Sequence, residues 1–132
     1  MTTSPLARAA GAVALAGTSL LAHAETPAAQ RLFDLSSHIA DASAPPKYVG
    51  TVTETTHARA MQLQLRAGQA MERHSSDGAI LLHMIKGEAV FTFDQGAPLT
   101  VRAGQLLRMA PNEAHAVRVI ADMEALVIRV QP

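Results

Sequence analysis

Apolar and polar residues alternate with a period of two from Tyr48 to the end of the chain. The alternation occurs in short segments that glycine, proline, asparagine or aspartate separate, which is typical of β-strands with one buried face. The segments predicted as strands are YVGTVTETT, ARAMQLQLRAG, AILLHMIKGEAVFTFDQG, APLTVRAGQLLRMAPNEAH and AVRVIADMEALVIRV.

Turn residues divide the longer segments further. We expect a bend at Lys86-Gly87, a turn at Ala103-Gly104 and a final hairpin that turns near Ala121-Asp122. The result is about eight short strands with regular turns, which is typical of a sandwich or a closed barrel. The sequence therefore predicts an all-β domain, a sandwich or a closed barrel, over residues 48–132.

Residues 25–47 precede this barrel and have a different pattern. Thr26-Pro27 is typical of a helix start, and Leu32, Phe33, Leu35 and Ile39 could form one apolar stripe at helical spacing. The segment SAPPK would end such a helix. We expect an N-terminal arm with a short helix that packs on the barrel.

Residues 1–24 have the pattern of a signal peptide. Arg8 is their only charge, an alanine-rich apolar run follows it, and Ala22-His23-Ala24 forms an A-x-A cleavage site. The run is too short and too weakly apolar for a typical membrane span. We expect export to the periplasm or beyond, with cleavage after Ala24 and no membrane attachment afterwards. The alternative is an uncleaved anchor or a buried alanine-rich helix.

Composition narrows the chemistry. Eleven basic and eleven acidic residues leave no net charge at pH 7, so no basic field attracts nucleic acid or a membrane surface. The chain has no cysteine, which excludes disulfides, thiolate metal sites and cysteine nucleophiles. The composition therefore gives no indication of nucleic acid or a membrane surface as a partner.

Two glycine-to-histidine spacings resemble those of the cupin superfamily. Gly68 lies six residues before His74, Gly87 follows thirteen residues later, and Gly104 lies eleven residues before His115. The segments LRAGQAMERH, IKGEAVF and VRAGQLLRMAPNEAH carry this resemblance over roughly residues 50–130. The resemblance implies a jelly-roll barrel of the kind found in small stand-alone bacterial cupins.

The metal motif that the resemblance implies is incomplete. Cupins bind metal through three histidines and a glutamate, and only His74 and His115 match those positions. Ser76 stands at the second histidine position and Ile80 at the glutamate position. In the second motif Asn112 stands where a glycine is expected, and asparagine still tolerates a left-handed turn.

Glu72 offers a replacement for the missing carboxylate. Glu72 and His74 are two residues apart, so on a regular strand both side chains point to one face. If His115 faces them, the three residues form a two-histidine, one-carboxylate set for one divalent ion, such as Fe, Mn, Ni or Zn. The alternative is a solvated Glu72 paired with Arg73 or Arg66.

The interior of the barrel is predicted to be apolar. The candidate pocket residues are Met61, Leu63, Ile80, Leu82, Met84 and Met109. Methionine adapts to irregular cavities, although simple core packing is the alternative for each of these residues. His83 is expected on the opposite face of its strand, half-buried under the arm or at a dimer interface, while His38 and His57 are expected to be exposed.

Three functions follow from these observations. The first is a small-molecule-binding module with an apolar pocket and a polar mouth at His74 and His115. The second is a metal-dependent enzyme, an Fe(II)-type oxygenase or an isomerase, that uses Glu72 and the histidine pair. The third is a non-catalytic structural homodimer, since cupins often pair through strand edges. A ligand binder requires a cavity of about 300 Å³ or more.

Overall fold

The structure is a computed structural model that describes residues 30–39 and 43–132. Residues Asp34–Pro132 form one compact unit, and residues 30–33 belong to a separate unit. The described residues contain no helix, and hence none that is long and apolar enough to cross a membrane. The predicted signal peptide lies outside the described residues.

Seven strands make up the compact unit, and they confirm the all-β prediction. Their bounds are β1 Lys47–Glu54, β2 Ala58–Leu65, β3 Ala70–His74, β4 Ile80–Phe93, β5 Leu99–Arg102, β6 Leu106–Met109 and β7 His115–Val130. All pairings between these strands are antiparallel. The alternating sequence produces this result because each strand buries one face.

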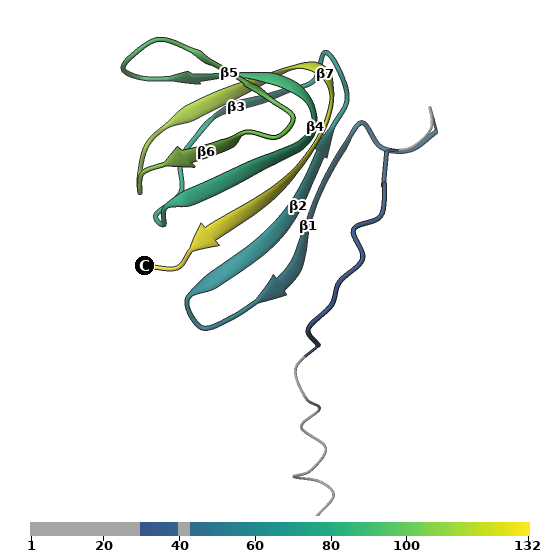
Figure 1. Cartoon of the computed structure of the whole chain (residues 1–132). Helices are drawn as coiled ribbons and strands as arrows, with labels where there is room; N and C mark the ends of the chain where they lie inside the picture. The colour runs from purple at the N-terminus through teal and green to yellow at the C-terminus, as the bar shows by residue number, and fades with distance from the viewer. Residues whose placement is uncertain (1–29, 40–42) are drawn as a thin grey trace, which may run out of the picture. The chain divides into compact units, whose positions relative to one another are not determined.

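The long strands β4 and β7 pair with each other and connect two layers of the barrel (Figure 1). One layer has the order β1, β2, the second part of β7, the first part of β4, and β6. The other layer has the order β3, the first part of β7, the second part of β4, and β5. This arrangement is the predicted jelly roll.

The hairpin predicted near Ala121-Asp122 is wrong, because β7 continues through these residues. Opposite them, the register between β4 and β7 shifts at several steps from Met84 to Ala89. Gly87 lies in this region with a φ of 91° and approaches the backbone of Asp122 closely. The turn-like residues Lys86-Gly87 and Ala121-Asp122 therefore mark the place where β4 and β7, each a continuous strand, pass from one layer to the other.

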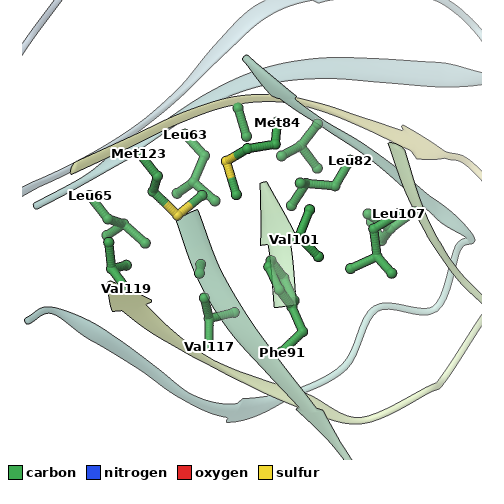
Figure 2. Packing of buried hydrophobic residues seen from close by; sticks show 14 of the residues in the cluster. Leu63, Leu65, Leu82, Met84, Phe91, Val101, Leu107, Val117, Val119 and Met123 are labelled. Atoms are coloured by element: carbon green, nitrogen blue, oxygen red, sulfur yellow. The ribbon is translucent and has the colours of Figure 1, made fainter. Parts of the chain in front are cut away.

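The hydrophobic core fills the space between the two layers (Figure 2). Phe91, Leu65, Met84 and Met123 are its largest fully buried apolar side chains. On β4, Ile80, Leu82 and Met84 are buried while His83 and Ile85 are exposed. The inward and outward faces of this strand follow the alternation in the sequence, as predicted.

The helix expected in the arm is wrong for residues 30–39, which are irregular. Gln62 and Gln64 on β2 are buried, and their side-chain amides both donate to the carbonyl oxygen of Ser36, over 2.8 and 3.2 Å. The backbone N–H of His38 donates to Oε1 of Gln64 over 2.7 Å. Backbone groups that a helix would pair internally are thus bound by side chains of the barrel.

Candidate functional site

An apolar cavity of about 180 Å³ lies between the layers. Five of the six residues predicted for the pocket line it: Met61, Leu63, Ile80, Leu82 and Met109. Met84 does not line the cavity and instead has 0% exposure in the core. The further lining residues are Val49, Met71, His74, Ser76, Phe91, His115, Val117, Val127 and Arg129.

His74 and His115 meet at this cavity. His74 is the last residue of β3, His115 is the first residue of β7, and the two are register partners. Their ring centroids are 4.4 Å apart, with an angle of 62° between the ring planes. His115 is 6% exposed, whereas His74 is exposed. The structure therefore places the two histidines that carry the cupin resemblance side by side.

Both histidines use the same ring nitrogen to bind the main chain. Nδ1 of His74 lies 2.7 Å from the carbonyl oxygen of Glu72, and Nδ1 of His115 lies 2.9 Å from that of Glu113. A carbonyl oxygen can only accept, so each Nδ1 carries the proton and donates it. In the neutral ring each Nε2 is then a free acceptor that is available to a ligand.

The Glu72 carboxylate is not brought to the histidine pair. Met71 is opposite Val117 and His74 is opposite His115, so three steps on β3 match two steps on β7. This extra residue is a β-bulge, which reverses the alternation and places Met71 rather than Glu72 beside the cavity with His74. Glu72 is exposed and contributes only its main-chain carbonyl.

The alternative pairing of Glu72 with Arg73 does not occur among the described residues, because Arg73 forms an ion pair with Asp94. The part of the chain that the structure describes contains no group of three His, Asp or Glu residues able to hold a metal ion. Ser76 does line the cavity, and so does Ile80, but neither supplies an imidazole or carboxylate. The residues present therefore do not fit a hard divalent ion.

Arg129 is a residue of the site that the sequence analysis missed. Its Nε donates to Oγ of Ser76 over 3.1 Å, and its Nη2 donates to the carboxylate of Asp77. The hydrogen bond from Arg129 holds the pKa of Asp77 below its usual range. The alternation in β7 could have indicated that Arg129 faces the cavity, because Val127 and Arg129 are two residues apart and their side chains share a face.

The remaining histidines of the described residues lie away from the cavity. His83 was expected to be half-buried but is exposed on β4, and His57 is exposed in the turn before β2, as expected. His38 was expected to be exposed but is half-buried, because its ring stacks on Tyr48 with centroids 3.7 Å apart. Among the histidines that the structure describes, His74 and His115 alone line the cavity.

The pKa of His115 is lowered, first by burial and also by the nearby His74, while the hydrogen bond to Glu113 acts in the opposite direction. The unfolded chain, with a histidine pKa of about 6.5, therefore binds the proton first as the pH falls. The stability from the neutral His115 is present above about pH 6.5 and is lost as the pH falls toward the folded pKa.

We expect the free energy of unfolding to be lower at pH 5 than at pH 7.5, as urea denaturation would measure. His115→Asn keeps a donor near Glu113 but does not titrate, so it should flatten this dependence. His57→Gln is the control, because it removes an exposed imidazole outside the cavity. An equal pH dependence in wild type and His115→Asn would contradict the prediction.

The fold and the histidine pair define a cupin, and solved structures agree on the fold. An RmlC-like cupin with a double-stranded β-helix from Methanocaldococcus jannaschii has 20% identity and a TM-score of 0.65, with coverage of 80% of this chain and 94% of that chain. A cupin superfamily protein from Desulfitobacterium hafniense has 17% identity and a TM-score of 0.63, with the same coverages. KdgF from a Halomonas species has 12% identity and a TM-score of 0.65, with coverages of 77% and 95%.

The family is narrower than the fold. Residues 60–132 match the model of the AraC-like ligand binding domain, and the chain belongs to this family. No curated protein matches the chain significantly.

Proposed function

We propose that this protein binds a small, largely apolar molecule whose hydrogen-bond donor contacts His74 and His115. The observation that carries the proposal is the cavity itself, which is lined mainly by apolar side chains, with His74, Ser76, His115 and Arg129 as its polar residues. The family to which the chain belongs, the AraC-like ligand binding domain, supports a small molecule as the partner. A purely structural dimer would have no need of such a cavity.

The cavity volume limits the size of the molecule. At about 180 Å³ it does not meet the requirement of about 300 Å³ that the sequence analysis set for a ligand binder, a size typical of sites for drug-sized ligands. An apolar cavity of about 150 Å³ in another protein is large enough to bind benzene. We therefore propose a ligand with one ring, or an aliphatic chain of similar volume, rather than a drug-sized molecule.

The hydrogen bonds of the histidines limit its polar group. Nδ1 of each ring already donates to a backbone carbonyl, so a neutral pair offers only Nε2 acceptors. A hydroxyl or N–H group satisfies such acceptors. We propose a phenol or a small alcohol as the ligand class.

Phenol and toluene are a matched pair of probes, because they differ by a hydroxyl in place of a methyl group. We expect calorimetry to show that phenol binds about 3- to 10-fold more tightly than toluene, the effect of one net hydrogen bond. In His74→Leu the two affinities should become similar. Met71→Trp, which fills the cavity wall, should weaken both.

The outcome that would overturn the proposal is an absence of binding by both probes to a folded wild type. Equal affinities in the wild type would overturn the role of the histidines alone. Circular dichroism of each variant separates a lost ligand from a lost fold.

Export with cleavage after Ala24 and formation of a homodimer stay predictions from the sequence. The metal-dependent enzyme is the weaker candidate, because the carboxylate of Glu72 does not join His74 and His115. No reaction step is therefore assigned to this site.

A further inference from the structure

We propose that the same cavity holds a Cu(I) ion, bound by His74, His115 and the thioethers of Met71 and Met109. This site does not depend on the organic ligand proposed above. It replaces the hard divalent ion that the cupin resemblance implies, which the residues present do not fit.

Sulfur is concentrated at this cavity. The chain has six methionines, and three of them, Met61, Met71 and Met109, line the cavity together with the histidine pair. Met71 lies on β3 and faces the cavity with His74 because of the bulge between them. Met109 ends β6, is 2% exposed and is paired with Ile80, which also lines the cavity.

These ligand types select the ion. Thioether sulfur is a soft ligand that favours Cu(I), and imidazole binds copper as well. Iron, manganese and magnesium favour oxygen ligands from carboxylates or water. The Glu72 carboxylate would have supplied such an oxygen. A set of two imidazoles and one or two thioethers is therefore suited to Cu(I) rather than to iron or manganese.

The histidines are already oriented as metal ligands are. A metal-binding histidine nearly always donates its other ring N–H to a carbonyl or carboxylate, which fixes the ring and its tautomer. Here both Nδ1 atoms donate to main-chain carbonyls, of Glu72 and Glu113. The ring centroids are 4.4 Å apart, and Nδ1 is already used in both rings, which leaves the two Nε2 atoms for one ion.

The surroundings favour the lower charge state of copper. The walls of the cavity are formed by Leu63, Leu82, Phe91 and similar side chains. Burial of charge in such an apolar environment is costly, and the cost is smaller for Cu(I) than for Cu(II). The three rotatable bonds of methionine allow the sulfur of Met71 or Met109 to turn toward the ion without backbone movement.

The test is anaerobic titration of the full-length chain with Cu(I), in competition with a chromophoric Cu(I) chelator. We expect one equivalent to bind, and X-ray absorption should show both nitrogen and sulfur neighbours. Met71→Leu and Met109→Leu should each weaken binding by about tenfold or more, and the double variant should reduce it further. Met84→Leu is the matched control, because Met84 is buried outside the cavity and should leave the affinity unchanged.

Methionine-to-leucine changes nearly preserve side-chain volume, so the fold and the apolar wall should persist. Phenol binding should therefore survive in the double leucine variant while Cu(I) binding is lost, which separates this proposal from the proposed function. A folded wild type that binds no Cu(I) would overturn the site. Wild-type Cu(I) affinity in the double leucine variant would overturn the role of the thioethers, and stoichiometric Fe(II) or Zn(II) without Cu(I) would contradict the choice of ion.

Discussion

Gly87→Ala should lower the free energy of unfolding by about 3 kcal/mol, as urea denaturation would measure. Two effects add at this position. The φ of 91° is a conformation that strains any residue with a Cβ. The new Cβ would also overlap the carbonyl oxygen of Asp122 and lie 2.6 Å from Cα of Met123. The neighbouring strand β7 would have to shift.

Gly104→Ala separates these two effects. Gly104 has a φ of 89°, nearly that of Gly87, but its Cβ would meet nothing within 4 Å. This variant should show only the backbone strain, a loss of about 1 to 2 kcal/mol. If both variants lose the same stability, the overlap of the new Cβ with β7 does not add to the loss at Gly87.

Phe91→Ala should reduce stability by about 3 to 5 kcal/mol, the usual cost of removing a buried phenylalanine. Phe91 is 1% exposed on β4 and lines the cavity, so the deletion both loses buried apolar area and enlarges a space that already exists. Urea denaturation measures the loss. The enlarged cavity should also accept a two-ring probe such as naphthol.

Thr92→Ala is the matched control on the same strand, because Thr92 is exposed beside Phe91. Its effect should stay within about 0.5 kcal/mol. A loss for Phe91→Ala of the same small size would mean that the interior repacks around the deletion. In that case naphthol would not bind.

The local alternation of the sequence predicted most of the fold. The alternation with a period of two predicted which side chains of β4 point inward. The glycine-to-histidine spacings indicated that His74 and His115 would meet. Asn112 was expected to tolerate a left-handed turn, and its φ is 63°. These features depend on residues that are close together in the chain or on the two glycine-to-histidine motifs. They can therefore be predicted from a single sequence.

The features that the sequence did not predict depend on contacts between distant segments. The bulge in β3 arises from its pairing with β7, and no glycine in AMERH signals it. Gln62 and Gln64 have the alternation of solvent-facing positions, yet the arm covers them. Ala121-Asp122 has turn chemistry, but pairing with β4 keeps the strand continuous.

The sharing of β4 and β7 between the two layers has a consequence for cooperativity. Each layer contains part of both strands, so neither layer can unfold while the other keeps its central pair. Local opening should therefore be confined to the end strands of the two layers, which are β1, β3, β5 and β6, and their amides should exchange with solvent earliest. The amides between β4 and β7 should exchange only through global unfolding, as a single kinetic unit.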